Sequence, residues 1–258
     1  MAGRPESEPI AERGAHSPIV LLHGFGQTGR CWGPLAPALA GERDVIALDL
    51  PGHGGASAVE ADLWTTADLV LDATDGPAAL IGYSMGGRMA LHAALLRPER
   101  VTGLVLISAT AGIDDDDERA ARRAADEALA ARIGTIGVDA FTDEWLAQQL
   151  FAGLPEAYRF DEERRRNHPA GLAMSLRRAG TGTQEPLWDR LGELTMPVLL
   201  MAGANDAKFT ALAERMAASV GDRATLAVVG ATGHSVHLEQ PAVTTELVAT
   251  WLGNGAVR

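Results

Sequence analysis

The sequence has one cysteine, Cys31, so no disulfide can form within the chain. A chain without disulfides is typical of a reducing compartment, and we expect a cytoplasmic location. Cys31 has no histidine placed to activate it in sequence, and we interpret it as buried filler beside Trp32. Apolar runs are also short, since none approaches the roughly 20 residues that span a bilayer. The segment Met1–Pro18 is polar and lacks the apolar core of a signal peptide, so membrane insertion is not expected.

Positive charge is scarce as well. The chain has 22 lysines and arginines against 34 aspartates and glutamates, which gives a formal net charge of −12. Such a balance disfavours general binding to nucleic acids or to anionic membranes. The basic residues are nearly all arginine, because Lys208 is the single lysine, and half of them lie between Arg119 and Arg190. Positive charge is therefore concentrated in one stretch of the chain.

Aromatic residues make up only 5% of the chain, yet 47% of its residues are hydrophobic and the mean hydropathy is +0.01. These values are typical of a globular protein, and 258 residues suffice for one large α/β domain or two small ones. Helical patterns such as Arg88–Leu96 and Phe209–Val220 alternate with short apolar runs, which predicts a mostly parallel sheet with helices on both faces. The runs expected as buried strands are Ile19–Leu22, Val45–Leu48, Ala78–Ile81, Leu104–Ser108, Val198–Ala202 and Thr225–Val229.

The alternation stops in residues 113–190. This segment is rich in Ala, Arg and Glu, with amphipathic stretches at Asp117–Ile133 and Val138–Gln149 and no convincing strand. The acidic run Asp114–Asp117 lacks the spacing of a metal-binding loop, and we interpret it as the entry to a helix. The segment is predicted to be a helical lid over the active site, with additional surface helices as the alternative. The predicted core then consists of residues 1–112 and 191–258.

The most informative stretch is Ala78–Arg88, in which Gly82-Tyr83-Ser84-Met85-Gly86 fits G-x-S-x-G between an apolar run and a helical pattern. So tight a turn strains the serine backbone and needs glycine on both sides, where a Cβ would collide. The hydroxyl of Ser84 would stand exposed at a helix N-terminus, which favours developing negative charge. An ordinary Gly/Ser turn is the alternative, but the strand–turn–helix context favours a reactive serine.

A serine hydroxyl is a poor nucleophile or base unless a histidine, oriented by a carboxylate, takes its proton. Asp206 follows the predicted strand Val198–Ala202, and His234 follows the predicted strand Thr225–Val229. Because the carboxyl ends of parallel strands share one edge of the sheet, the three side chains can converge there. The alternatives are that Asp206 only caps the next helix and that His234 only packs. Asp49 and His237 are weaker candidates.

Two backbone N–H groups are expected to form an oxyanion hole, from Met85 after the serine and from Phe25 in the loop after the first strand. Arg88 lies one helical turn beyond Ser84, and Lys208 lies next but one to Asp206. Fixed cations near such a site suit a substrate that carries carboxylates. The glycine-rich pieces fit neither a P-loop nor G-x-G-x-x-G, and H-E-x-x-H is absent, so we expect neither a cofactor nor a metal.

The sequence resembles the 2-succinyl-6-hydroxy-2,4-cyclohexadiene-1-carboxylate synthases of menaquinone biosynthesis, which belong to the α/β-hydrolase superfamily. The similarity extends over most of the chain, from Leu21 to the loop of His234. The motifs that carry it are Gly82–Arg88, Asp206–Phe209, Asn167–Ala173 and Gly180–Gln184.

This resemblance implies a lyase that eliminates pyruvate from a cyclohexene bearing succinyl, carboxyl and enolpyruvyl groups. Ser84 would be the general base, with His234 and Asp206 behind it. The carboxylates of the substrate would be bound by Arg88, Arg122 and Arg166, and Lys208 is a further candidate. Arg122 and Arg166 each belong to an arginine cluster, so a neighbour could serve instead. The pocket would be shaped by Tyr83 and Trp145.

Two rival functions share the same residues. A carboxylesterase or carbon–carbon hydrolase would use Ser84, His234 and Asp206 to form an acyl-enzyme. A non-catalytic binding protein with this fold would no longer turn over its ligand. In each of these functions the expected binding partner is a small molecule. The sequence leaves the oligomeric state open.

Overall fold

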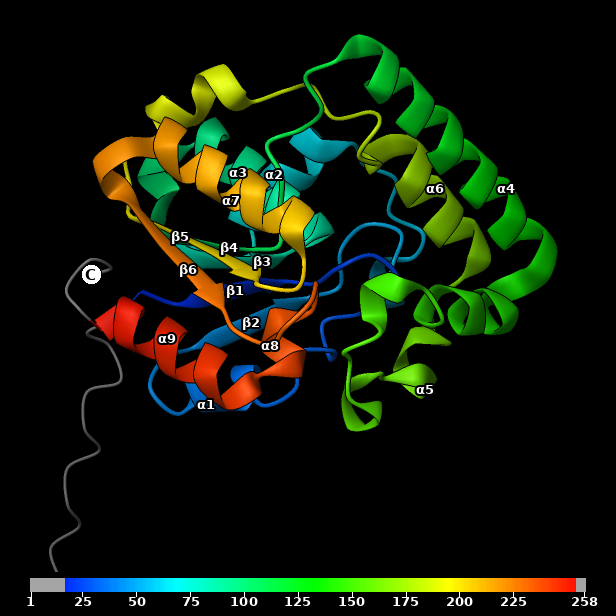
Figure 1. Ribbon diagram of the computed structural model, residues 1–258, viewed down its shortest axis with the longest axis horizontal. Coiled ribbons are helices and arrows are strands. Elements are labelled where there is room, and N and C mark those ends of the chain that lie inside the picture. The colour runs from blue at the N-terminus through cyan, green and yellow to red at the C-terminus, as the bar shows by residue number, and fades with distance from the viewer. Residues whose placement is uncertain (1–16, 254–258) are drawn as a thin grey trace, which may run out of the picture.

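The computed structural model describes residues 17–253, so most of the segment Met1–Pro18 lies outside the described residues. Its centre is a six-stranded parallel sheet in the order β2-β1-β3-β4-β5-β6 (Figure 1). The strands are β1 Ile19–Leu22, β2 Val45–Leu48, β3 Ala78–Tyr83, β4 Val101–Ile107, β5 Val198–Gly203 and β6 Ala224–Val229. Every strand predicted from an apolar run is present, which confirms the predicted fold class. One boundary matters later: β4 ends at Ile107, before the predicted Ser108.

Helices cover both faces of the sheet (Figure 1). On one face lie α2 Leu63–Leu71, α3 Met85–Leu96 and α7 Ala207–Val220, and on the other lie α1 Leu35–Ala40, α8 Val236–Glu239 and α9 Pro241–Gly253. The sheet separates two hydrophobic cores, because alternate residues of β1 face opposite ways. Val20 and Leu22 belong to one core, whereas Ile19 and Leu21 belong to the other. Burial on both faces explains why these strands read as continuous apolar runs rather than alternating ones.

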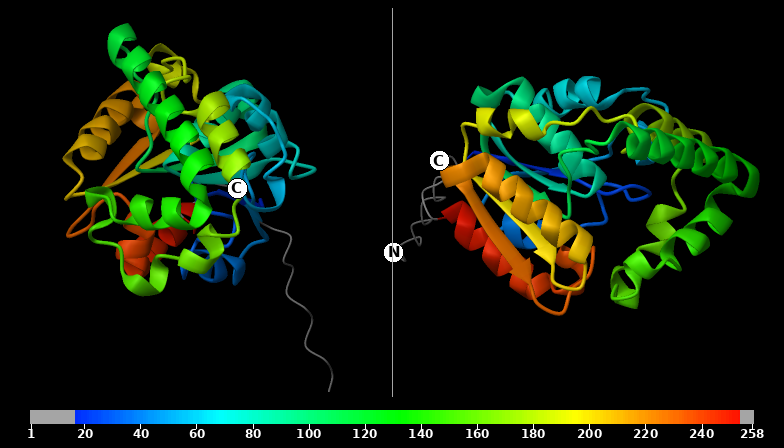
Figure 2. Two further views of the ribbon diagram at one scale, coloured as in Figure 1. Left: turned by 90° about the vertical axis from the view of Figure 1, so that its right-hand side faces the viewer. Right: turned by 45° about the horizontal axis from the view of Figure 1, so that its top comes forward.

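Residues 113–190, all of them described, contain no strand and project beyond one side of the sheet (Figure 2). Their helices are α4 Asp116–Leu146, α5 Asp161–Arg164 and α6 Pro169–Ala179. The side chain of Asp115 caps α4 by accepting the N–H groups of Asp117 and Glu118 at 3.0 and 2.9 Å, so the acidic run is a helix entry as predicted. Gly137, with φ 78° and ψ 173°, interrupts α4 between the two predicted amphipathic stretches.

The inserted helices α4 and α6 share a small hydrophobic core of their own. Its buried members are Ala130, Ile133, Phe141, Leu172, Ala173 and Leu176. This core contains residues of no strand, and Phe25 from the loop after β1 packs against it. The insertion is therefore held over the carboxyl ends of the strands. Within residues 17–253, no helix is both long and apolar enough to cross a membrane.

Candidate active site

Ser84 forms the whole turn between β3, which ends at Tyr83, and α3, which begins at Met85. Its backbone has φ 51° and ψ −107°, a conformation that costs a non-glycine residue about 1–3 kcal/mol. A Cβ on Gly86 would lie 1.9 Å from the carbonyl oxygen of Leu22, and one on Gly82 would lie 2.5 Å from the carbonyl oxygen of Gly86. Gly86 is thus needed because the start of α3 approaches the backbone of β1 closely. Gly82 is needed because the end of β3 approaches the start of α3 closely.

The side chains of Ser84, His234 and Asp206 are hydrogen bonded in series. The Oγ of Ser84 lies 3.0 Å from Nε2 of His234, and Nδ1 of His234 lies 2.9 Å from Oδ2 of Asp206. Because a carboxylate only accepts hydrogen bonds, Nδ1 carries the proton and Nε2 is free to accept from the serine hydroxyl. Asp206 also caps α7, since its Oδ1 accepts the N–H of Phe209 at 3.2 Å. Asp206 can therefore cap α7 and orient the imidazole of His234 at the same time.

The electrostatics around Asp206 favour its charged form. Burial by itself would raise its pKa, but hydrogen bonds from His234 and from the N–H of Phe209, with the charges of His234 and Lys208, outweigh burial and lower it. Asp206 is consequently an anion at neutral pH and orients the imidazole. His234 is almost fully buried, at 3% exposure, and it lines the cavity together with Ser84.

Two N–H groups point to an oxyanion site. Among the described residues, the backbone N–H of neither Phe25 nor Met85 has a hydrogen-bond acceptor, and both residues line the cavity at Ser84. The neighbouring N–H groups are occupied: that of Gly24 donates to Gln27 Oε1 at 2.9 Å, and that of Gly26 donates to His53 Nε2 at 3.1 Å. Hydrogen bonds on both sides of Phe25 therefore fix the loop after β1. Within the described residues, the N–H of Phe25 is left without an acceptor beside the N-terminus of α3.

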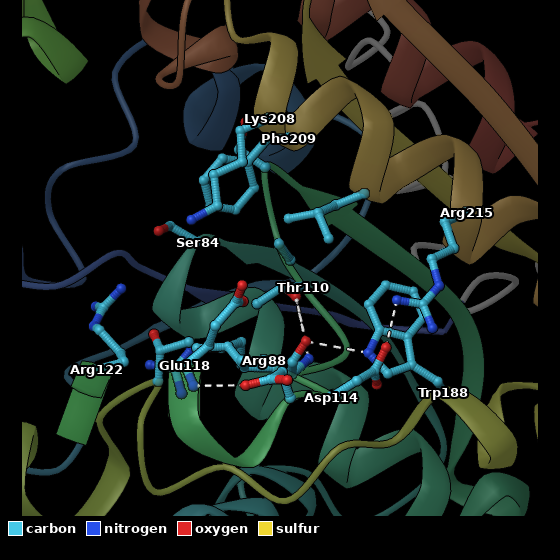
Figure 3. Close-up of a pocket in the computed structure, with 17 residues that line it drawn as sticks. Ser84, Arg88, Thr110, Asp114, Glu118, Arg122, Trp188, Lys208, Phe209 and Arg215 are labelled. Atoms are coloured by element: carbon cyan, nitrogen blue, oxygen red, sulfur yellow. Dashed lines mark hydrogen bonds and ion pairs between the residues drawn. The ribbon is translucent and has the colours of Figure 1, made fainter. Parts of the chain in front are cut away.

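Two adjoining cavities meet at Ser84. The larger, of about 490 Å³, lies under the insertion and is named the insertion lobe. Its walls include Phe25, Met85, Leu129, Trp145, Ser175 and Leu176. The smaller, of about 380 Å³, lies beyond the end of β4 and is named the strand-end lobe (Figure 3). Its walls include Ser108, Thr110, Asp114, Trp188, Leu212 and Arg215. Both lobes are lined by Ser84, Arg88, Arg122, Thr181, Lys208 and Phe209.

Arg88 is a buried cation that forms no ion pair among the described residues, although the charge of Asp126, which pairs with Arg122, is near enough to raise the pKa of Arg88. It is 6% exposed, and its Nη1 has no hydrogen-bond partner among the described residues. Burial and then the nearby charge of Arg122 lower the pKa of Arg88 to about 10, so it is still protonated at neutral pH. In Figure 3 it faces Ser84 and Lys208 across the cavity. An unpaired buried charge is costly to the fold, which points to an anionic ligand as its missing partner.

Most of the other predicted binding residues lie at the cavities. Arg122 and Lys208 line both lobes, although Arg122 also donates from Nε to the buried Asp126 at 2.8 Å. Trp145 lines the insertion lobe. Tyr83 lies behind the serine, where its hydroxyl bonds to Ser235 Oγ at 2.8 Å and burial raises its pKa. It reaches only a small cavity of about 30 Å³ that adjoins Ser84 and His234.

Arg166 is the exception, because the structure does not bring it to the site. Its side chain is 61% exposed and lies 3.6 Å from Glu163. Arg164 is buried instead, with Nη1 unpartnered among the described residues, and it lines the small cavity beside Ser84. Arg164 is the last residue of α5, whereas Arg166 lies beyond the end of that helix, so the two side chains are oriented by different local structure. Sequence alone did not say which arginine of the cluster turns inward.

The sequence did not single out Ser108, and it indicated Asn167 only as the first residue of a motif that carries the family resemblance. Ser108 was expected inside a strand, but it lies one residue past β4 with φ 49° and lines the strand-end lobe. A polar residue directly after an apolar run could have indicated it, since ligands bind beyond the carboxyl ends of parallel strands. Asn167 ties the insertion to the core by donating to the carbonyl of Gly26 at 3.2 Å and accepting the N–H of Gly54 at 2.9 Å.

The parallel sheet and the strained serine, followed along the chain first by the aspartate and then by the histidine of the hydrogen-bonded series, define a protein of the α/β-hydrolase class. A family model described as "Alpha/beta hydrolase family" matches residues 19–247. The 2-succinyl-6-hydroxy-2,4-cyclohexadiene-1-carboxylate synthase of Salmonella paratyphi C (strain RKS4594) is 32% identical, over 87% of this chain and 89% of that protein. A Bacillus subtilis (strain 168) protein, provisionally given the same name, is 36% identical over 94% of this chain and 93% of its own.

Among solved structures, that of MenH from S. aureus superposes with a TM-score of 0.86 at 30% identity and covers 92% of this chain and 93% of its own. The chain belongs to the alpha/beta hydrolase family and, within it, to the 2-succinyl-6-hydroxy-2,4-cyclohexadiene-1-carboxylate synthases. The family resemblance stated from the sequence is confirmed. Among residues 17–253, no group of three or more His, Cys, Asp or Glu side chains is placed to hold a metal ion.

Proposed function

We propose that this chain is a lyase that eliminates pyruvate from 2-succinyl-5-enolpyruvyl-6-hydroxy-3-cyclohexene-1-carboxylate, a step of menaquinone biosynthesis. The relatives carry the name of the product of that reaction, and they match nearly the whole chain. The observation that carries the proposal is the unpaired Arg88 buried in a cavity shared with Ser84. A general esterase has no need of such a cation, whereas a substrate with several carboxylates supplies its counter-ion. From the lone cysteine we also propose a cytoplasmic location.

In this proposal Ser84 acts as a general base. Its proton passes to Nε2 of His234, and Asp206 stabilises the imidazolium that forms. The serine oxygen then takes the proton from ring carbon 2, which is acidic because the succinyl ketone is attached there. The electron pair moves into the ring and onto the ketone oxygen, where the N–H groups of Phe25 and Met85 stabilise it. No bond forms between Ser84 and the substrate, so no acyl-enzyme arises.

Elimination completes the reaction. The double bond between carbons 3 and 4 shifts, the bond from carbon 5 to oxygen breaks, and its electrons leave with the enolpyruvyl oxygen. That enolate takes up one proton to become pyruvate, so the protons lost and gained balance. The enzyme returns to its starting state when His234 gives up its proton.

The substrate carboxylates are bound, in this proposal, by cations around the cavities. Arg88 is the central one, with Arg122 and Lys208 at its sides, and the buried Arg164 takes the place first expected for Arg166. Trp145 and Tyr83 shape the walls. Residues 113–190 act as a lid over the core formed by residues 1–112 and 191–258. What supports this division is the separate hydrophobic core of the insertion and its position above Ser84.

The test is pyruvate release from the enolpyruvyl substrate, measured with lactate dehydrogenase and NADH. Ser84→Ala should lower the rate by about 10³-fold or more, because it removes the base itself. Ser219→Ala, the same substitution at an exposed position of α7, should leave the rate unchanged. Pyruvate release by the native chain no faster than by Ser84→Ala would refute the lyase. Rapid turnover of simple esters with trapping of an acyl-enzyme would favour the hydrolase instead.

A further inference from the structure

Ser108 is placed beside Ser84 by the register of the sheet. Tyr83 of β3 pairs with Ile107 of β4, so the residues that follow, Ser84 and Ser108, stand next to each other at the carboxyl ends of the two strands. Both have positive φ, 51° and 49°. A residue other than glycine whose backbone is held at positive φ often marks a functional position. The mechanism proposed above uses the first serine and leaves the second without a role.

The hydroxyl of Ser108 is buried without a partner. The residue is 1% exposed, and among the described residues its Oγ has no hydrogen bond. Other polar groups of the strand-end lobe are satisfied by the chain: Thr110 Oγ1 and Trp188 Nε1 both donate to the carbonyl of Gly112, at 3.3 and 3.1 Å. The inner wall of this lobe therefore presents two unpartnered buried donors, Ser108 Oγ and Arg88 Nη1. A hydroxyl and a guanidinium that line one cavity suit a carboxylate.

The outer end of the strand-end lobe is different, because its cation, Arg215, is already paired with a carboxylate. Arg215 forms an ion pair with Asp114 at 2.6 Å and stacks 3.7 Å above the ring of Trp188 (Figure 3). Asp114, Asp115 and Glu118 are exposed and lie at the mouth. An anion would therefore find its complement at the buried inner wall and not at the mouth.

The two lobes also differ in whether the residues of the proposed oxyanion site line them. Phe25 and Met85, whose N–H groups would hold the ketone oxygen, line the insertion lobe and do not line the strand-end lobe. The leaving group is attached to carbon 5, which lies across the six-membered ring from carbon 2. When carbon 2 is at Ser84 with its ketone toward Phe25 and Met85, the enolpyruvyl group is directed toward the other lobe.

We propose that the strand-end lobe binds the three-carbon enolpyruvyl leaving group and that Ser108, with Arg88, binds its carboxylate. The inference rests on the proposed function and deepens it by assigning each half of the substrate to a lobe. As the bond from carbon 5 to oxygen breaks, the enolate remains in the strand-end lobe, gains a proton and becomes pyruvate. Pyruvate then leaves past Arg215 without crossing the ring product in the insertion lobe.

The experiment measures inhibition by added pyruvate, with the reaction followed by the ultraviolet absorbance of the conjugated diene product. Ser108→Ala and Ser108→Gly both remove the hydroxyl, and glycine also relieves the strain of positive φ. Each should raise the inhibition constant for pyruvate by roughly tenfold to a hundredfold, the usual value of a hydrogen bond to a charged group. Ser175→Ala removes a buried hydroxyl from the insertion lobe and is the matched control, with the constant unchanged.

An unchanged constant in both Ser108 variants, an equal rise in Ser175→Ala, or native enzyme that saturating pyruvate does not inhibit would each overturn the assignment. Thermal melts verify that the variants are folded, and agreement between the alanine and glycine variants separates the hydroxyl from the backbone. Failure of the proposed function gives a different result, since the native chain would then release no pyruvate at all.

Discussion

At the scale of single residues, the site depends on groups whose burial is unfavourable unless a ligand is bound. Arg88 illustrates this, because its charge lies inside the protein with Nη1 unpartnered among the described residues. Removing a charge of this kind relieves a desolvation cost. Its removal also deletes the counter-charge for a substrate carboxylate. Activity and stability should therefore respond in opposite directions.

Arg88→Met keeps the volume of the side chain and removes the charge. We expect kcat/KM for pyruvate release to fall by about 100-fold or more, while the free energy of unfolding stays within about 1 kcal/mol of the native value or rises. Enzyme kinetics and urea denaturation measure the two quantities. Arg132→Met, at an exposed arginine paired with Glu144, is the control and should change neither. Equal losses of activity and stability in Arg88→Met would make Arg88 a structural residue.

At the scale of elements, Asn167 joins the insertion to the loop after β1 that contains Phe25. Asn167, before α6, is 3% exposed and bonds to Gly26 and Gly54 of the core and to the carbonyl of Arg164. Gly26 follows Phe25, which lines the insertion lobe and whose N–H has no acceptor among the described residues. The position of the insertion is therefore coupled to the position of the proposed oxyanion site.

Asn167→Ala should weaken both the fold and the site. Three hydrogen bonds are lost from a buried position, so the free energy of unfolding should fall by about 1–3 kcal/mol. KM should rise several-fold, because the insertion and the Phe25 loop lose their common support. Asn167→Asp retains the acceptor for Gly54 and removes the donor to Gly26, which separates the two contacts. A loss of stability with an unchanged KM would show that Asn167 acts on the fold alone.

At the scale of the whole molecule, four histidines outside the Ser84 series are buried and uncharged. Burial lowers the pKa of His23 and His92 to about 4 and the pKa of His53 and His237 to about 3. In the unfolded chain these imidazoles have the ordinary pKa of about 6.5. As the pH falls below that value, these histidines therefore bind protons in the unfolded chain, whereas in the folded chain they remain neutral until a lower pH.

Stability should accordingly be full above about pH 6.5 and decline as the pH falls toward about 4, by up to about 1.4 kcal/mol per pH unit for each histidine. Guanidinium denaturation at a series of pH values measures this slope. His92→Gln removes one of the four and should make the slope shallower, with no change near pH 8 beyond a constant offset. A free energy of unfolding that is flat between pH 7 and pH 5 would contradict the prediction.

Much of the fold followed from local sequence. The six apolar runs are the strands of the sheet, because strands buried on both faces must be continuously apolar. Helix starts were less well predicted: α3 begins at Met85 rather than Arg88, and α7 at Ala207 rather than Phe209. The first turn of α3 contains two glycines, and the first turn of α7 directly follows Asp206. Neither turn shows the apolar periodicity from which a helix is predicted.

The chain order alone placed Ser84, Asp206 and His234 at the same edge of the sheet, since the carboxyl ends of parallel strands share one edge. Only the tertiary structure decided that Arg164 rather than Arg166 turns inward and that two cavity lobes meet at Ser84. It also decided that Ser108 stands next to Ser84 with no hydrogen-bond partner within residues 17–253. Local sequence determines which elements form because their periodicity reflects burial. Which side chain of a cluster reaches a site depends on rotation and packing between elements distant in sequence, which no local pattern records.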